Sequence, residues 1–210
     1  MNYALEPQLR SRISHNLAAL DQVDCADPSL RRAAVAVLVS GHAPGAMADV
    51  VVTLRAARLN RHSGQYALPG GRLDEGESVV QAALRETHEE IGLSLGEDAV
   101  LGLLDDMVTR SGFVITPVVA WAGPVSSFVP DPAEVDTVYR IPLSELDGPE
   151  VPSIIPDRDS GKLVMSAVFP TLGHRMFAPT AAMIYQFREV CLHGRATRVG
   201  DFGQPEFTRG

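Results

Sequence analysis

The chain has few cysteines and no long apolar segment. Only Cys25 and Cys191 occur among its 210 residues, far apart in sequence. They match neither a disulfide framework nor a zinc-binding spacing, so we expect two free thiols in a reducing compartment. No segment is apolar over the roughly 18 residues that a membrane helix requires. The first residues also lack the basic and apolar parts of a signal peptide. We therefore expect a cytoplasmic protein without a membrane partner.

The chain also lacks an excess of positive charge. Its 18 Lys and Arg residues face 26 Asp and Glu residues, which gives a formal net charge of −8. A general nucleic-acid binder needs a basic surface, so we expect no nucleic-acid partner. The length and the 45% of hydrophobic residues suffice for one globular domain with its own core. Such a protein can still bind a small phosphorylated molecule, through metal ions and a few local arginines.

The most informative segment, residues 70 to 93, reads GGRLDEGESVVQAALRETHEEIGL. Ser78 and Gln81 have the spacing of a capping box, which predicts a helix over residues 79 to 91. Gly92 is suited to its left-handed C-terminal cap. A glycine-rich loop therefore leads directly into a helix.

Three glutamates of this helix, Glu86, Glu89 and Glu90, fall within an arc of about 100°. Carboxylates this close repel one another and stay ionised most readily around a cation. Hard oxygen ligands suit Mg²⁺ or Mn²⁺. The alternative is a solvated helix face with i,i+4 charge pairs, but no lysines stand at the positions that such pairs require. The pattern favours a metal site beside a glycine loop, as needed to cleave a diphosphate.

This segment resembles the signature of the Nudix hydrolases. The matching positions are Gly71, Glu77, Arg85, Glu86, Glu89, Glu90, Gly92 and Leu93. Thr87 occupies an apolar slot of the signature, where its methyl group can still pack. The resemblance implies an α+β protein with the Nudix fold, a mixed β-sheet between helices in an α/β/α arrangement. It also implies hydrolysis of a nucleoside diphosphate linked to another group, with Mg²⁺ or Mn²⁺ as cofactor.

The resemblance further implies roles at the matching positions. Glu86, Glu89 and Glu90 would hold metal, together with the backbone carbonyl of Gly70. Glu86, with Arg85 and Glu89, would belong to the catalytic set, and Glu86 would orient or deprotonate the attacking water. Arg85 and Glu77 would pair and fix the loop against the helix.

A second resemblance concerns the Nudix enzymes that act on coenzyme A. Residues 53 to 71, TLRAARLNRHSGQYALPGG, are similar to the extended motif of that subfamily, although Leu68 replaces its usual Phe. Residues 109 to 119 and 131 to 146 also resemble it. The implied reaction splits the diphosphate of coenzyme A or acyl-coenzyme A into 3′,5′-ADP and (acyl-)4′-phosphopantetheine.

Coenzyme A carries a 3′-phosphate, so its recognition needs cations beyond the metals. The substrate-binding candidates are Arg55, Arg58, His62 and Gly71, with Arg110 as a further one. Each arginine could instead be a solvated surface charge, and His62 a hydrogen-bonded loop residue. Glu134 could supply an additional ligand or base, or be an exposed loop glutamate. Phe113, Trp121 and Phe128 could stack on adenine, with core packing as the default.

The rest of the chain alternates between apolar runs and turns. Apolar patterns predict strands at 33–39, 50–55, 99–104, 113–122 and 135–141, a hairpin over 154–169 with its turn at 159–161, and helices over 5–20 and 180–192. Pro117 suggests an edge or a bulge in the fourth strand. We expect an N-terminal helix and connector (1–32), a Nudix domain (33–194) and a mobile tail (195–210). The two terminal helices could form a homodimer interface or pack on their own domain.

Two further readings stay open. One is the same chemistry on ADP-ribose, NADH or another nucleoside diphosphate derivative, which the signature alone does not distinguish. The other is a non-catalytic nucleotide-sensing domain on a Nudix scaffold. Such domains normally lose signature glutamates, and all are present here.

Overall fold

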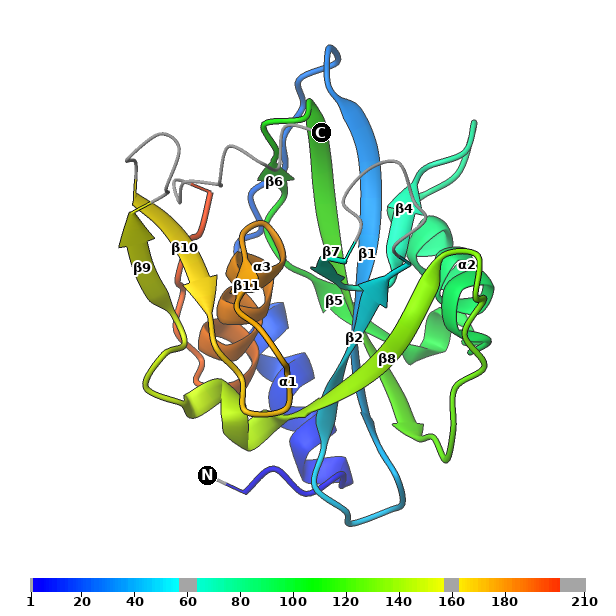
Figure 1. Ribbon diagram of the computed structural model, residues 1–210, viewed down its shortest axis with the longest axis vertical. Helices are drawn as coiled ribbons and strands as arrows, with labels where there is room; N and C mark the ends of the chain where they lie inside the picture. The colour runs from blue at the N-terminus through cyan, green and yellow to red at the C-terminus, as the bar shows by residue number, and fades with distance from the viewer. Residues whose placement is uncertain (1, 57–63, 157–162, 201–210) are drawn as a thin grey trace.

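The computed structural model describes residues 2–56, 64–156 and 163–200. An 8-stranded mixed sheet forms its centre (Figure 1). Its strands are β1 (Arg31–Gly41), β2 (Asp49–Arg55), β3 (Tyr66–Ala67), β4 (Gly70–Arg72), β5 (Val100–Leu103), β6 (Met107–Val108), β7 (Phe113–Pro124) and β8 (Val135–Pro142). The main order is β3-β2-β1-β7-β5, while β4 pairs with β1, β6 with β7 and β8 with β2. β1 and β7 are parallel.

Strand β1 is buried on both faces of this sheet, as its unbroken apolar run predicts. Ala34, Ala36 and Leu38 pack with helix α2 (Val79–Ile91). The alternating residues from Val35 to Val39 belong to the other cluster, which includes helices α1 (Pro7–Ala18) and α3 (Thr180–Phe187). Figure 1 shows α2 on one side and α3 on the other. The predicted α+β arrangement, with a mixed sheet between helices, is confirmed.

Helix α2 has the predicted bounds because its caps form as the sequence indicates. Ser78 Oγ accepts from the Gln81 backbone N–H at 3.2 Å, and Gln81 Oε1 accepts from the Ser78 N–H at 3.0 Å. Gly92 ends the helix with a φ of 69°. Thr87 is fully buried and its hydroxyl donates to the Ala83 carbonyl at 2.7 Å, so the polar atom in the apolar slot is satisfied.

The C-terminal part adds a 3-stranded sheet in the order β11-β10-β9. Its strands are β9 (Ser153–Pro156), β10 (Leu163–Ala167) and β11 (Met176–Phe177). β9 and β10 form the predicted antiparallel hairpin, whose turn at 159–161 lies outside the described residues. The predicted helix over 180–192 is α3, continued by a π-helical turn (Arg188–Leu192). Short 3₁₀ turns span Glu97–Ala99 and Leu143–Asp147.

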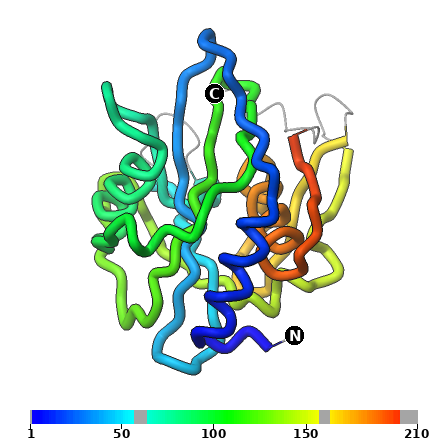
Figure 2. The backbone as a smooth tube through the Cα atoms, turned by 180° about the vertical axis from the view of Figure 1, so that it is seen from behind, coloured from blue at the N-terminus to red at the C-terminus, as the bar shows by residue number. Residues whose placement is uncertain are grey.

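Both terminal helices are buried within the chain itself. Leu9, Ile13 and Leu17 of α1 enter the same core cluster as α3, and Figure 2 shows α1 beside the C-terminal helical segment. Of the two alternatives for these helices, the structure therefore shows packing on their own domain. The division into 1–32, 33–194 and 195–210 stays a prediction. In the part of the tail that is described, Val199 is buried and Arg198 pairs with Asp105.

The expectation of an edge strand at Pro117 is wrong, and the register shift of β7 against β1 lies further along, between Trp121 and Gly123. β7 lies between β1 on one side and β5 and β6 on the other, and Pro117 stands opposite Val35 in unbroken register with β1. On its other side, the partner changes from β5, at Val118, to β6, at Ile115. The missing N–H of proline is tolerated at this interruption. Among the described residues, no helix has the length and hydropathy needed to cross a membrane.

Candidate functional site

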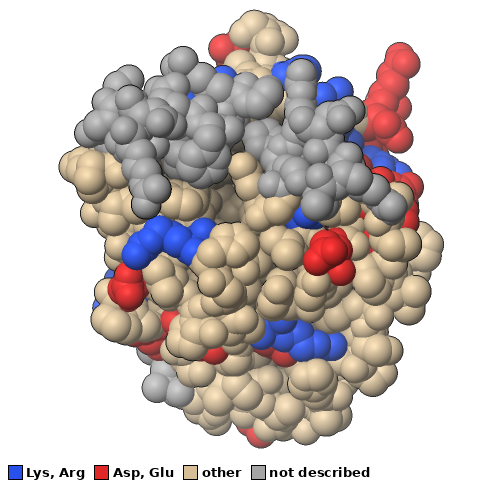
Figure 3. Space-filling view, in the orientation of Figure 1, with Lys and Arg blue, Asp and Glu red and all other residues tan. Residues whose placement is uncertain are grey.

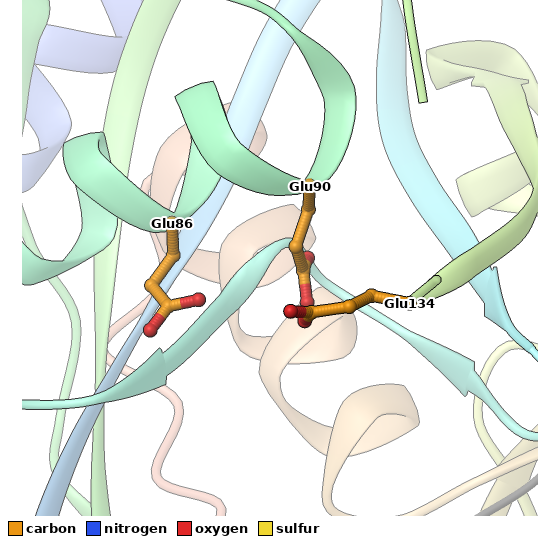
Figure 4. Close-up of side chains that lie close together, drawn as sticks. All are labelled: Glu86, Glu90 and Glu134. Carbon is orange, nitrogen blue, oxygen red and sulfur yellow. The ribbon is translucent and has the colours of Figure 1, made fainter. Parts of the chain in front are cut away.

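Three carboxylates converge at one end of the central sheet. Glu86 and Glu90 project from α2, and Glu134 reaches them from the segment before β8 (Figure 4). One oxygen of each lies within 4.8 Å of the others. Glu90 is buried, Glu86 half-buried and Glu134 exposed, so the group extends from the protein interior to the surface. We call it the carboxylate cluster.

Backbone hydrogen bonds fix the position of Glu134 relative to α2. The Asp131 N–H donates to the carbonyl of Glu90 at 3.0 Å, and the Glu134 N–H donates to Asp131 at 3.0 Å. The carbonyl of Glu134 in turn accepts from the Ala56 N–H at 2.9 Å, just beyond β2. Glu86 and Glu90 are one helical turn apart and share a face. Helix, loop and sheet thus hold the cluster together.

The cluster carries negative charge that the protein compensates only in part. Burial raises the pKa of Glu90 to about 7, while Arg55 and the Gly70 N–H oppose this shift. The Arg55 guanidinium is 3.7 Å from Glu90, and the Gly70 nitrogen is 3.2 Å from it. Burial also raises the pKa of Glu86, against the effect of Arg85. A cation among the three oxygens would relieve this cost, and hard oxygen donors suit a divalent ion such as Mg²⁺.

The two glycines of β4 let the sheet approach the cluster. Gly70 has a φ of 155°, and a Cβ atom there would overlap the carbonyl of Ala34 in β1. A Cβ atom on Gly71 would overlap the carboxylate of Glu86. Both positions therefore require the absence of a side chain, the first for strand pairing and the second for the position of Glu86.

Arg85 connects the glycine loop to the helix. Its Nε and Nη2 bind the two oxygens of Glu77 at 2.9 and 3.0 Å, and Nη2 also donates to the Arg72 carbonyl at 3.0 Å. Its Nη1 binds both Glu86 and Glu89 at 2.9 Å. The ionic hydrogen bonds from Arg85 hold the pKa of Glu77 below its usual value. Arg85 thus orients the Glu86 carboxylate.

The sequence profile of the NUDIX domain matches residues 30–160 of this chain, more than half of its length. The chain belongs to the Nudix family. Among curated relatives, the mitochondrial coenzyme A diphosphatase NUDT8 of Homo sapiens is 40% identical over 120 residues, which cover 55% of this chain and 51% of the relative. The uncharacterized Nudix hydrolase NudL of Citrobacter koseri is 39% identical over 117 residues, covering 55% and 59%. The matches thus span little more than half of these relatives.

A solved MutT/nudix family protein from Enterococcus faecalis has the same fold. It aligns with a TM-score of 0.53 at 18% identity, over 77% of this chain and 62% of that one. At this identity the likeness concerns the fold alone.

The Nudix signature and the carboxylate cluster overlap without being identical. Glu86 and Glu90 are in both. Glu89 is in the signature, but its side chain is 52% exposed and bound to Arg85, outside the cluster. Glu134 is in the cluster although it lies well beyond the signature. An arc of about 100° is wide enough for its two ends to face different neighbours, which is why helical spacing did not separate Glu89 from Glu90.

A cavity of about 340 Å³ adjoins the cluster on the α3 side of the sheet. Arg55, Gly70 and Gly71 form its boundary with the cluster, and Val35, Leu68, Ile115 and Met183 give it an apolar interior. Thr180 and Met183 come from α3, beyond the range matched by the family profile. A second cavity of about 200 Å³ shares Gln65, Tyr66, Pro179 and Thr180 with the first. In the orientation of Figure 1, the surface formed by the described residues is mostly uncharged, with a few separate charged patches (Figure 3).

The predicted substrate-binding residues fall into three groups. Arg55 and Gly71 line the first cavity. Arg110 lies between Thr109 and Ser111, which line it as well. Arg58 and His62 lie outside the described residues. Of the three aromatic candidates, Phe113 lines the cavity, whereas Trp121 and Phe128 pack against the two core clusters.

Two arginines at or beside the cavity were missed by sequence reasoning. Arg72 lines it, and the Arg31 guanidinium lies over the ring of Phe113 at the same place. The position of Arg72 directly after the paired glycines was the only signal in the sequence. Arg31 gave none, because the register of β1 with β7 brings it to Phe113.

Proposed function

We propose that this Nudix domain hydrolyses the diphosphate bond of coenzyme A or acyl-coenzyme A, with Mg²⁺ or Mn²⁺, giving 3′,5′-ADP and (acyl-)4′-phosphopantetheine. The observation that carries the proposal is the carboxylate cluster against Gly70 and Gly71, two glycines that also line a cavity. The choice of substrate is supported by the sequence of residues 53 to 71 and by the similarity to a coenzyme A diphosphatase.

The residues present fit a divalent metal ion. Three hard oxygen donors lie within 4.8 Å, one of them buried with a pKa raised to about 7. Glu86, Glu90 and Glu134 would hold the metal, with the Gly70 carbonyl and Glu89 as the further ligands that the family signature implies. A bound divalent ion supplies positive charge that neutralises the diphosphate and stabilises the leaving oxygen.

Glu86 is the proposed general base. Its carboxylate is half-buried, and burial raises its pKa toward the range in which a base is effective near neutral pH. It would orient the attacking water and accept its proton as the water attacks one phosphorus in line. Arg85 is a positioning residue, because it holds Glu86 through Nη1 while its other nitrogens are fixed by Glu77 and the Arg72 carbonyl.

Arg55 is the proposed contact between protein and diphosphate. It lies between the cavity and Glu90, and at 3.7 Å its ion pair with Glu90 is long. A metal among the carboxylates would compete for Glu90 and free the guanidinium to bind phosphate oxygens. Arg58, His62 and Arg110 stay candidates for the same task.

A substrate panel tests this function directly. The purified protein would be incubated with Mg²⁺ or Mn²⁺ and with coenzyme A, acetyl-coenzyme A, ADP-ribose or NADH, and the products separated by chromatography. We expect 3′,5′-ADP from the first two substrates and none after chelation of the metal. Glu86→Gln should lower kcat by about 10² to 10⁴. Glu97→Gln, at an exposed position outside the cluster, is the matched control.

Fast turnover of ADP-ribose or NADH without 3′,5′-ADP from coenzyme A would leave the diphosphatase chemistry intact and change the substrate. No turnover of any substrate, with a Glu90→Gln protein that retains its function in the cell, would favour the nucleotide-sensing alternative.

We also infer that the partner is a small nucleotide-type molecule in the cytoplasm rather than nucleic acid or a membrane. The net charge of −8 and the cavity beside the carboxylate cluster support this choice of partner. A homodimer stays a prediction. It would have to use surfaces other than the buried faces of α1 and α3.

A further inference from the structure

Two arginines stack on one phenylalanine at the edge of the first cavity. The guanidinium carbon of Arg31 lies 3.9 Å from the ring centroid of Phe113, and that of Arg72 lies 5.1 Å from it. A guanidinium lying on an aromatic ring uses its flat face, so its N–H donors stay directed outward in its own plane. We call these three residues the Arg–Phe–Arg stack.

The strands place the stack beside the carboxylate cluster but on the opposite face of the sheet. Gly71 faces Glu86, and Arg72 is the next residue of β4, so its side chain points the other way. Arg31 stands opposite Phe113, and Arg72 stands opposite Ala33, two residues along β1 from Arg31. Gly71, Arg72 and Phe113 all line the first cavity, so the stack adjoins the same cavity as the glycine that faces Glu86.

Within the described residues, the two arginines differ from most others because they lack a carboxylate partner. Ion pairs with Asp or Glu are formed by Arg32, Arg55, Arg85, Arg140, Arg175, Arg188, Arg195 and Arg198. Within the described ranges, no carboxylate is paired with Arg31 or Arg72, and both are exposed. One Arg31 nitrogen donates to the Ser111 carbonyl at 2.8 Å. In a protein with a net charge of −8, two uncompensated neighbouring cations form a local site for an anion.

The surroundings favour a phosphate over a carboxylate or an apolar group. The cavity interior is apolar and cannot stabilise a charge, so an anion would stay at the edge formed by the stack. Ser111 also lines the cavity, and its hydroxyl lies 3.1 Å from that of Thr109, which is itself bound to the Phe113 carbonyl at 3.2 Å. The Ser111 hydroxyl can therefore donate to a further oxygen. Two arginine forks and one hydroxyl match a group with several outward oxygens.

We propose that the Arg–Phe–Arg stack binds a phosphate monoester on the ribose of the substrate, separate from the diphosphate that is cleaved. The proposal rests on the proposed function and adds to it. It assigns recognition of this phosphate to Arg31 and Arg72, and it makes the enzyme selective for a nucleotide phosphorylated on its ribose. The phosphate could be the 3′ group of coenzyme A or the 2′ group of NADPH, and both have the same chemistry.

Paired substrates with and without the monoester test the subsite. The kcat/KM values of wild type, Arg31→Gln, Arg72→Gln and the double variant would be measured with coenzyme A and 3′-dephospho-coenzyme A, and with NADPH and NADH. In whichever pair is hydrolysed, each single variant should lower kcat/KM for the phosphorylated substrate by about tenfold or more, as expected for a charge-assisted contact. The kcat/KM for the substrate without the monoester should change by less than about twofold. Equal losses for both members, or no loss, would overturn the proposal.

Arg12→Gln is the matched control. Arg12 also stacks on an aromatic ring, that of Tyr3 at 5.7 Å, but it belongs to α1 and does not line either cavity. Its substitution should leave kcat/KM unchanged for both substrates of each pair. Thermal unfolding of every variant would show whether a loss reflects a contact or an unfolded protein.

A binding measurement separates this proposal from the proposed function. Titration calorimetry with adenosine 3′,5′-bisphosphate, adenosine 2′,5′-bisphosphate and AMP requires no turnover. If no substrate is hydrolysed, the proposed function fails. The subsite is still supported if wild type prefers a bisphosphate over AMP and the double variant does not. A wild-type protein that binds all three ligands equally would overturn the subsite, whatever the activity.

Discussion

Gly71 lies directly against the carboxylate of Glu86, so closely that any side chain at position 71 would overlap it. The backbone at Gly71 has no left-handed φ, so alanine can adopt its conformation. Gly71→Ala should therefore displace the Glu86 carboxylate while leaving the fold in place. We expect kcat to fall by about 10²-fold, the cost of misplacing a catalytic group by roughly 1 Å.

Two other glycines provide the comparison. Gly70→Ala would place a Cβ atom against the backbone of β1, and Gly70 itself has a φ of 155° that alanine rarely adopts. This variant should therefore unfold at a clearly lower temperature than wild type. At Gly200 a Cβ atom would meet no atom within 4 Å, so Gly200→Ala should change neither kcat nor the unfolding temperature. An active Gly71→Ala protein would show that the position of Glu86 is not critical.

The exclusion of Glu89 from the carboxylate cluster gives a second prediction. Glu134→Gln should weaken Mn²⁺ binding by about tenfold or more, because Glu134 contributes an oxygen to the group within 4.8 Å. Glu89→Gln should have a smaller effect, because the Glu89 side chain is 52% exposed and bound to Arg85. Electron paramagnetic resonance of Mn²⁺ titrations would compare the two variants. A larger loss of Mn²⁺ affinity in Glu89→Gln than in Glu134→Gln would instead support the ligand set that the signature alone implies.

The raised pKa of Glu90 gives a prediction for the metal-free protein. Its pKa is about 7 in the folded state, against an ordinary value of 4.5. Between these values the unfolded chain releases this proton first, so the Glu90 carboxyl lowers stability as the pH rises from 4.5 to about 7. Glu90→Gln removes the charge. In the presence of a chelator, its unfolding temperature should exceed that of wild type at about pH 8.

The same comparison at low pH is the control. Near the ordinary glutamate pKa of 4.5, Glu90 is protonated in the folded protein, so the stabilising effect of Glu90→Gln should largely disappear. A constant difference between the two proteins at all pH values would mean that packing, rather than charge, determines the effect. Added Mg²⁺ should stabilise wild type and not the variant.

Arg85 allows a test of the fork geometry that holds Glu86. Arg85 contacts Glu77, Glu86, Glu89 and the Arg72 carbonyl with three different nitrogens. Lysine keeps the charge but cannot make these contacts together. Arg85→Lys should lower kcat by about 10- to 100-fold with little change in KM, as expected for a group that acts through Glu86. A rise in KM alone would mean that Arg85 contacts the substrate.

The sequence predicted the parts of the site that depend on local interactions. The bounds of α2 follow from its capping box and from Gly92, and Glu86 and Glu90 follow from helical spacing, all within one short segment. Thr87 was recognised as a packing residue for the same reason.

The rest of the site depends on contacts between distant segments. Glu134 joins the cluster through backbone hydrogen bonds to α2 and to the end of β2, which no local pattern indicates. Arg31 and Arg72 meet at Phe113 only because β1 pairs with both β4 and β7. Pro117 was misread because the interruption between β5 and β6 that accommodates it is a property of the sheet.

Anomalous diffraction from crystals soaked in Mn²⁺ tests the central claim most directly. The account predicts a strong manganese peak bounded by the carboxylates of Glu86, Glu90 and Glu134, and its loss in Glu90→Gln crystals. An empty cluster in crystals of a protein that still cleaves a diphosphate in the presence of a chelator would contradict it.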